Sequence, residues 1–175
     1  MSPDIDVLAR HHYPAAAALM VEPGTPWARY GMHVDDARAV LESAEGGSCL
    51  LQATDQGHLA GWIWYEPTGT FFHSGYIRIL AVRQDRVGTG VGSSLLEAAE
   101  KDLFTQTANV FLLVSEWNTR ARRFYQLHGY AEVGSLNSYV HPGVAELICW
   151  KTSGPIQLAA TDRHREPYGS SCPVR

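Results

Sequence analysis

Residues 76–101 have the sequence YIRILAVRQDRVGTGVGSSLLEAAEK, which predicts a strand, a glycine-rich loop and a helix in succession. The loop is GTGVG at residues 88–92, and from Val91 to Leu103 the apolar residues recur at helical spacing. The strand residues alternate, so we expect two sets of side chains on opposite faces: Ile77, Ile79 and Ala81 on one, and Arg78, Leu80 and Val82 on the other.

The glycine loop predicts a site for a phosphate-bearing cofactor. A loop of this kind leaves backbone N–H groups pointing outward at the start of a helix, where the helix dipole favours an anion. The spacing is not that of a dinucleotide fold, because a third glycine counted from Gly88 would fall on Ser93. A nucleotide-triphosphate loop would end in Gly-Lys-Ser or Gly-Lys-Thr, and neither occurs here. A plain tight turn without a ligand is the alternative.

A second strand and helix follow at residues 110–130, with the sequence VFLLVSEWNTRARRFYQLHGY. The apolar run at residues 110–114 predicts a buried strand. Asn118 is a favourable N-cap for the helix that follows, and Gly129 is suited to the position just after its end. This segment therefore predicts a strand and a short helix, as the first segment does.

Together the two segments resemble the cofactor motifs of the GNAT superfamily of N-acetyltransferases. The resemblance depends on G-x-G-x-G after a strand that ends in LAV, and on N-x-x-A-x-x-F-Y-x-x-x-G-Y downstream of it. It covers roughly residues 48–151. It implies the GNAT fold, an α/β (α+β) domain with a mixed central sheet of six to seven strands flanked by about four helices.

The rest of the chain is compatible with that layout. We expect strands at residues 5–8, 48–54, 58–66, 131–136 and 144–152, and helices at 11–20 and 34–44. Asp55-Gln56-Gly57 predicts a hairpin turn, residues 21–29 a loop and residues 67–70 a turn. One domain is expected over residues 1–152, followed by an irregular tail at 153–175.

Composition excludes several other classes of protein. The 175 residues are 45% hydrophobic and 18% charged, which indicates a globular domain of ordinary size. A formal charge of −4 argues against a general nucleic-acid binder, and no apolar run reaches the length of a membrane span. Cys49 and Cys149 lie in apolar strands and indicate buried thiols in a reducing, cytoplasmic compartment. His11 and His12 have no partner at metal-ligand spacing, so no metal is expected.

The resemblance implies that acetyl-CoA is the cosubstrate and that this chain binds it in two places. Backbone N–H groups of the glycine loop would hold the pyrophosphate, and the end of the central strand would pair with the pantetheine arm like an added strand. A backbone N–H near Val82 would stabilise the oxyanion of the reacting thioester. The residues implied are Leu80, Ala81, Val82, Val87, Gly88, Thr89, Gly90, Val91, Gly92, Ser93, Asn118, Ala121 and Tyr125.

The same resemblance implies transfer of the acetyl group to an amine by direct attack within a ternary complex. Tyr125 is our candidate general acid, because its phenol would protonate the departing thiolate; the alternative is that it only packs against the thioester. Asn118 would position Tyr125 or bond the pantetheine, beside its capping role. For the general base, Glu116 ranks ahead of Glu66 and His73, since no carboxylate lies within residues 76–82.

One residue departs from the family pattern. The position before the first glycine is usually Arg or Gln, whereas here it is Val87, preceded by Arg86. Backbone contacts to the phosphates would survive, and Arg86 would be the side chain available to replace the missing contact. Two alternatives therefore stay open beside an acetyltransferase: a non-catalytic acyl-CoA-binding or sensor module, and an enzyme that transfers another acyl group.

The acceptor is not defined by the sequence. A small amine, a protein N-terminus or a lysine would each fit, and a polyamine is compatible with the acidic balance. Aromatic residues suggest an aromatic acceptor pocket, although a packed core would look the same: Trp27, Tyr30, Trp62, Trp64 and Trp117. A homodimer paired through the last strand is an expectation by analogy alone.

Overall fold

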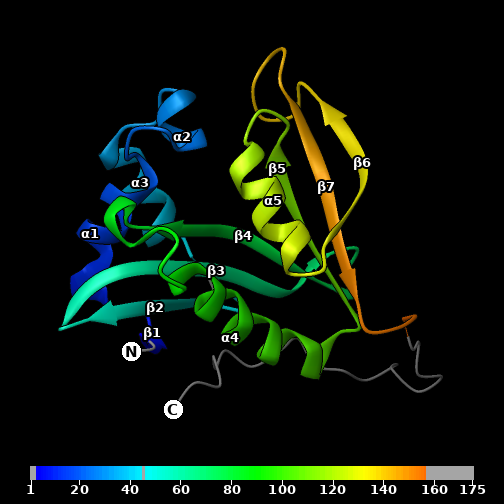
Figure 1. Cartoon of the computed structure of the whole chain (residues 1–175), viewed down its shortest axis with the longest axis horizontal. Coiled ribbons are helices and arrows are strands. Elements are labelled where there is room, and N and C mark those ends of the chain that lie inside the picture. Colours follow the sequence, from blue (N-terminus) through cyan, green and yellow to red (C-terminus); the bar gives the residue numbers. More distant parts are fainter. Residues whose placement is uncertain (1–2, 45, 157–175) are drawn as a thin grey trace.

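The computed structural model describes residues 3–44 and 46–156, which form one mixed seven-stranded sheet with helices on both faces (Figure 1). The strand order is β1-β2-β3-β4-β5-β7-β6. The strands are β1 (Asp4–Val7), β2 (Cys49–Asp55), β3 (His58–Thr70), β4 (Ser74–Val82), β5 (Asn109–Ser115), β6 (Ala131–Asn137) and β7 (Ala145–Thr152). The helices are α1 (Tyr13–Met20), α2 (Pro26–Arg29), α3 (Val34–Glu42), α4 (Val91–Gln106) and α5 (Thr119–Leu127), with single 3-10 turns η1 (Arg10–His12) and η2 (Gln84–Arg86).

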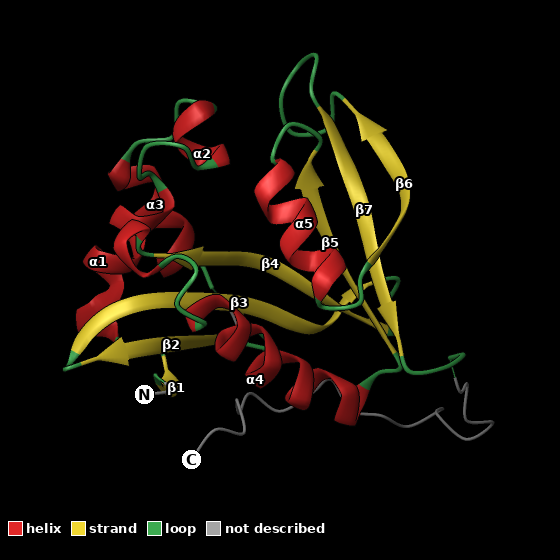
Figure 2. Ribbon diagram, in the orientation of Figure 1, coloured by secondary structure: helices red, strands yellow, loops and turns green. Residues whose placement is uncertain are grey.

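Helices lie on both faces of the sheet (Figure 2), and an apolar cluster is buried on each face. Helices α4 and α5 pack with one face, where Leu51, Ile63 and Leu112 are buried. Helices α1 and α3 pack with the other, where Trp62 and Trp64 lie in the core. Burial of apolar area on both faces supplies the main favourable free energy of folding. The predicted fold class is therefore confirmed.

A β-bulge in β4 overturns part of the predicted alternation. β3 and β4 pair antiparallel, but Trp64 faces Ile79 and the next residue, Tyr65, faces Ile77, so Arg78 is an extra residue in β4. Beyond the bulge the side chains change face: Ile77 packs with α4, whereas Ile79 joins the α1–α3 cluster. The sequence prediction that 77, 79 and 81 share a face was wrong for this reason. Neither glycine nor proline occurs at residues 76–80 to signal the bulge.

β4 and β5 are parallel, and they separate at the same place. They pair only over Gly75–Ile77 and Val110–Leu112, although β4 continues to Val82 and β5 to Ser115. The edge of β4 from residue 78 onward is thus turned towards β5 without being paired to it. The two strands form an opening that widens towards the glycine loop.

Three shorter predictions need correction or lie outside the described residues. Residues 21–29 are not all loop, because Thr25 accepts a hydrogen bond from the backbone N–H of Ala28 at 3.2 Å and caps the one-turn helix α2. Residues 67–70 extend β3 instead of forming a turn, and the turn comes at residues 71–73. Cys49 and Cys149 are buried, as predicted. The predicted irregular tail lies mostly at 157–175, outside the described residues.

Candidate active site

The glycine loop is an open cradle of backbone donors. Gly88 and Gly90 have φ of +79° and +94°, and a Cβ added at either would meet no atom within 4 Å. The left-handed conformation favours glycine at both positions. Five backbone N–H groups of this segment have no acceptor among the described residues: those of Gly88, Gly90, Val91, Gly92 and Ser93. Together with the N-terminus of a 16-residue helix, they suit a pyrophosphate.

Contacts from neighbouring segments fix the shape of this loop. The Thr89 hydroxyl donates to the carbonyl of Arg86 at 2.6 Å, and Arg86 pairs with Asp55 of the β2–β3 hairpin. At the start of α4, the Ser93 hydroxyl lies 3.0 Å from Nε2 of His128, which follows α5. The loop is therefore preorganised by side chains that point away from its donors, and Arg86, the side chain available to replace the missing arginine, is engaged with Asp55.

The start of α4 packs closely against β3 and β4. A Cβ on Gly61 of β3 would lie 2.8 Å from the carbonyl oxygen of Ala81 and 3.1 Å from Cγ1 of Val91. Glycine is therefore required where β3, β4 and the first turn of α4 meet. This packing places the unpaired edge of β4, which includes Leu80, Ala81 and Val82, directly before the glycine loop.

Tyr125 projects from α5 into the cluster between that helix and the sheet. It is 8% exposed and packs edge to face with Phe124 and Tyr130. Burial raises the pKa of Tyr125, and the neighbouring Cys149 and Tyr76 add to the rise. The phenol is therefore protonated over the whole physiological range. Within the described residues, its hydroxyl makes no hydrogen bond.

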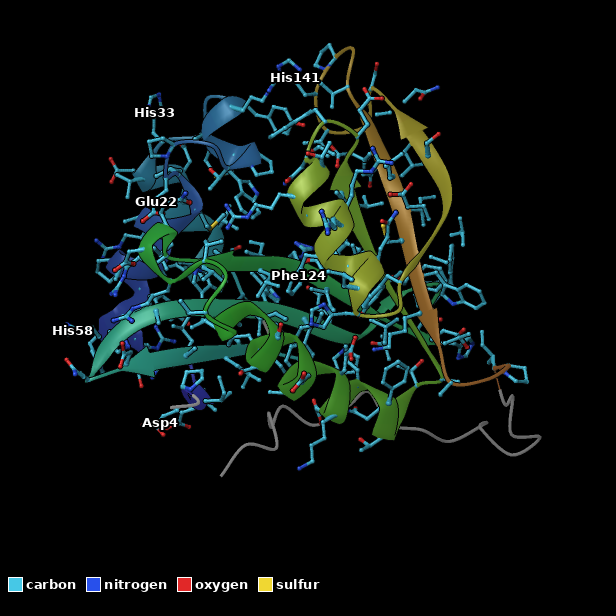
Figure 3. The ribbon with its side chains drawn as sticks, viewed as in Figure 1. Asp4, Glu22, His33, His58, Phe124 and His141 are labelled. Carbon is cyan, nitrogen blue, oxygen red and sulfur yellow. The ribbon has the colours of Figure 1, made fainter. Side chains whose placement is uncertain are left out.

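Asn118 is the N-cap of α5, as predicted. Its side-chain Oδ1 accepts a hydrogen bond from the backbone N–H of Ala121 at 3.1 Å, and Gly129 ends the helix with φ of +86°. Phe124 of the same helix lies where a Cβ on Gly92 would touch its ring at 3.5 Å. Helix α5 thus links the position of Tyr125 to the glycine loop (Figure 3, where Phe124 is labelled).

The three carboxylate or imidazole candidates for a base are dispersed. Glu116 is exposed just after β5, where its Oε1 accepts a hydrogen bond from the backbone N–H of Ala145 at 3.1 Å. Glu66 of β3 forms an ion pair with Arg78 at 3.3 Å. His73 lies in the turn before β4, at the end where β4 and β5 are still paired. Only Glu116 is at the open end of the two strands.

Sequence reasoning missed a polar cluster beside Glu116. Glu146 of β7 and Ser115 of β5 are each 4% exposed, and the Ser115 hydroxyl lies 2.9 Å from Glu146 Oε1. The Tyr30 hydroxyl lies 2.9 Å from Ser115 Oγ and 3.3 Å from Glu146 Oε1, and the indole N–H of Trp117 donates to it at 3.1 Å. The only signal in the sequence was a glutamate at an inward position of an apolar strand.

The tryptophans divide between the core and this cluster. Trp62 and Trp64 are 0% and 3% exposed within the α1–α3 core, and Trp27 packs against the same core. Their suggested role as acceptor-pocket walls therefore gives way to packing. Trp117 and Tyr30, by contrast, lie at the open end of the strands, with ring centroids 6.4 Å apart.

Metal-binding groups and membrane-spanning helices both bear on the class of site. No group of three or more His, Cys, Asp or Glu side chains in residues 3–44 and 46–156 is placed to hold a metal ion. In the same residues, no helix combines the length and the apolar character needed to cross a membrane.

Comparison with solved structures finds the same fold in several acetyltransferases. A ribosomal-protein-alanine N-acetyltransferase from Brucella melitensis superposes with a TM-score of 0.70 at 20% identity, over 85% of this chain and 99% of that chain. An aminoglycoside 6'-N-acetyltransferase complexed with coenzyme A gives 0.70 at 18% identity, over 87% and 98%. The enzyme of that name from Enterococcus faecium gives 0.66 at 18% identity, also over 87% and 98%.

A match to a family model assigns the chain to a protein family, which structural similarity at this level of identity does not. No curated protein sequence matches the chain. Residues 13–130, however, match the model of the acetyltransferase (GNAT) family, and this range includes the glycine loop, the opening between β4 and β5, and Tyr125. The chain therefore belongs to the GNAT family of acetyltransferases.

Proposed function

We propose that this protein transfers an acetyl group from acetyl-CoA to a primary amine of a small molecule or a protein. The observation that carries the proposal is the opening between β4 and β5, which lies beside an open cradle of backbone donors at residues 88–93, with Tyr125 of α5 in the apolar cluster that Leu80 and Val82 of β4 also join. A crystallised neighbour of the same fold holds coenzyme A, which supports an acyl-CoA as the cosubstrate.

The backbone does most of the cosubstrate binding in this proposal. The N–H groups of Gly88, Gly90 and Gly92 receive the pyrophosphate, flanked by those of Val91 and Ser93. The unpaired edge of β4 offers alternating N–H and carbonyl groups to the two amides of the pantetheine arm, as an added strand would use them. Acetyl-CoA supplies the activated acetyl thioester. Val87, Thr89, Asn118 and Ala121 complete the predicted set of contacts.

Charge develops on the thioester oxygen when the amine nitrogen attacks the carbonyl carbon. A backbone N–H near Val82 is our proposed donor to that oxygen, because the bulge at Arg78 leaves this part of β4 free of β5. The carbon–sulfur bond then breaks, and sulfur needs a proton. Tyr125 donates it, since a phenol is protonated at neutral pH, and burial raises the pKa of this one further.

The amine must lose a proton before it attacks. An alkyl amine with a pKa near 10.4 is free base in only about one part in 2,500 at pH 7. Glu116 is the proton acceptor that we propose, as it is exposed at the open end of the strands and would pass the proton to solvent.

We propose a cytoplasmic location on the sequence evidence of buried cysteines.

The experiment that tests the proposal is acetyl-CoA binding by calorimetry, combined with CoA release against a panel of amines and peptides. The solved neighbours are named for acceptors that are amines, an aminoglycoside and a ribosomal-protein alanine, so both classes belong in the panel. Binding with turnover supports the transferase. Tight binding without turnover on the whole panel favours the sensor module, and tighter binding or faster turnover with a longer acyl-CoA favours the other acyl group. No binding refutes all three.

A further inference from the structure

Glu146 is a buried carboxylate whose charge no cation of the described chain compensates. It is 4% exposed at the second position of β7. Its Oε1 accepts hydrogen bonds from two neutral hydroxyls, those of Ser115 and Tyr30. Within residues 3–44 and 46–156, no lysine, arginine or histidine forms an ion pair with it, and its Oε2 has no hydrogen-bond partner.

Keeping the Glu146 carboxylate charged in this environment costs free energy unless a ligand supplies a positive group. Removing a carboxylate from water costs several kcal/mol in general, and two neutral hydroxyls return only part of that. Most other carboxylates at the strand edges of this sheet have a cation, as Glu66 has Arg78 and Glu132 has Arg122. The nearby Arg29 does not form an ion pair with Glu146, because its guanidinium lies over the Trp117 ring, 4.4 Å from the ring centroid. A positive group from outside the chain would complete the site.

The site lies beside the reacting end of the proposed channel. Ser115, the last residue of β5, is directly opposite Glu146 in the register of β5 and β7. Glu116 follows it and bonds the backbone N–H of Ala145, so both carboxylates hang from the same corner of the sheet. An acceptor nitrogen held by Glu146 would therefore lie at the unpaired end of β4 and β5, beside Glu116.

The walls of the site are aromatic. The Tyr30 ring stacks on His141 of the β6–β7 loop, with centroids 5.0 Å apart and planes 16° apart. Figure 3 shows His141 on the side of that loop that faces α2. Trp117 meets Tyr30 edge to face. Aromatic faces around a buried carboxylate favour an organic cation over a hydrated metal ion.

From this geometry we propose that Glu146, held by Ser115 and Tyr30, binds the ammonium group of the acceptor and selects amines that are cationic at neutral pH. The inference rests on the proposed function and adds the residue that recognises the acceptor. Glu116 keeps its role as the proposed proton acceptor.

The test is Glu146→Gln, which keeps the shape and a carbonyl acceptor but removes the charge. Acetyl-CoA affinity should stay within twofold, while kcat/KM for tyramine, spermidine and a short peptide with a free N-terminus falls about 100-fold, mainly through KM. With 4-aminophenol, which is uncharged at pH 7, kcat/KM should change less than threefold. Glu42→Gln, an exposed carboxylate on α3, is the matched control and should behave as wild type.

Equal kcat/KM for the cationic amines in Glu146→Gln and wild type would overturn the inference and leave the proposed function standing. The inference also fails if Glu116→Gln, and not Glu146→Gln, raises KM for those amines. Tyr30→Phe is a second variant, which removes one donor to the carboxylate; we expect KM to rise about threefold.

Thermal unfolding gives a readout that needs no acceptor. Because the uncompensated charge is destabilising, Glu146→Gln should raise Tm by about 2–5 °C. A lower Tm would mean that the carboxylate supports the fold, and would overturn the inference. Wild type that binds acetyl-CoA yet acetylates nothing would count against the proposed function, and the Tm comparison would still decide the Glu146 site.

Discussion

The two ends of the proposed binding site, both beside the unpaired end of β4 and β5, offer a ligand different kinds of group. At the glycine loop, the groups that point outward belong to the backbone of one short segment, residues 88–93. At the other end they are the side chains of Tyr30, Ser115 and Glu146, which are far apart in the sequence and meet only when the chain is folded. In our proposals, the first end binds an anion and the second binds a cation.

This difference predicts how each end tolerates substitution. Backbone donors depend on the conformation of the loop and not on which side chains it carries, so Val87 in place of the usual Arg or Gln removes at most one contact. The cluster around Glu146 depends on each side chain, because a hydroxyl or carboxylate that is lost leaves its buried partner unsatisfied. We therefore expect cofactor binding to be sensitive to the glycines, and acceptor binding to individual polar residues.

The largest expected effect comes from blocking the glycine loop. In Gly90→Trp the side chain would occupy the open space before the N–H groups and would strain a residue with φ of +94°. Loss of several charge-assisted hydrogen bonds corresponds to roughly 4 kcal/mol, so acetyl-CoA affinity should fall about 1,000-fold in calorimetry. The fold should persist, at a cost of about 1–2 kcal/mol for the strained residue.

Gly47→Trp is the matched control for that variant. Gly47 also has a positive φ, +101°, and its added Cβ would likewise meet nothing within 4 Å, but it lies in the turn before β2. It should lose similar stability and bind acetyl-CoA as wild type does. If Gly90→Trp bound acetyl-CoA normally, the loop would not be the phosphate site.

The next largest effect is expected for the chemistry between the two ends. Tyr125→Phe removes the hydroxyl and leaves the buried ring, so kcat should fall about 100-fold while the acetyl-CoA Kd stays within twofold. Tyr130→Phe is the control, since Tyr130 is another buried tyrosine of the same cluster and its pKa is also raised by burial. Unchanged turnover in Tyr125→Phe would show that this residue only packs against the thioester.

The pH dependence of turnover sharpens that assignment. Burial raises the pKa of Tyr125 above its ordinary value of 10.0, so the protonated form that donates persists at higher pH than a free phenol would allow. A residue with an unshifted pKa would lose half of its acid form at about pH 10, whereas kcat should stay level to about pH 10 here. A profile of kcat from about pH 7 to 10 checks this. The assignment would be contradicted if kcat fell at alkaline pH with a midpoint below that of a free phenol, and if this fall disappeared in Tyr125→Phe.

The same contrast explains how much of the molecule was predictable. The glycine loop and the caps of α5 depend on neighbours within a few residues, so Gly88, Gly90, Asn118 and Gly129 could be identified by type and spacing. Alternation and helical spacing likewise predicted most strands and helices, and both buried cysteines. These features follow from local conformational preferences, which a single sequence records.

Except for helix α2, the features that sequence reasoning missed depend on contacts between distant segments. The bulge at Arg78 reflects how β4 fits against β3, with no glycine or proline beside it to mark the position. Helix α2 was hidden in a stretch rich in proline and glycine, although Thr25 followed by Pro26 was a capping signal. Glu146 became notable only once Tyr30 and Ser115 were seen against it. A one-domain boundary at residue 152 and a homodimer stay predictions.

The smallest expected effect tests whether the backbone alone is sufficient at the glycine loop. Arg86 cannot readily replace the missing side chain, because its guanidinium pairs with Asp55. Val87→Arg would restore the residue usual in the family, and one charge-assisted hydrogen bond to a phosphate is worth about 1 kcal/mol at a solvated site. Acetyl-CoA affinity should therefore tighten about fivefold, and the gain should shrink at high salt, whereas Val87→Leu should bind as wild type does. If Val87→Arg left the Kd unchanged, the backbone N–H groups would already satisfy the phosphates, and the departure at residue 87 would carry no cost.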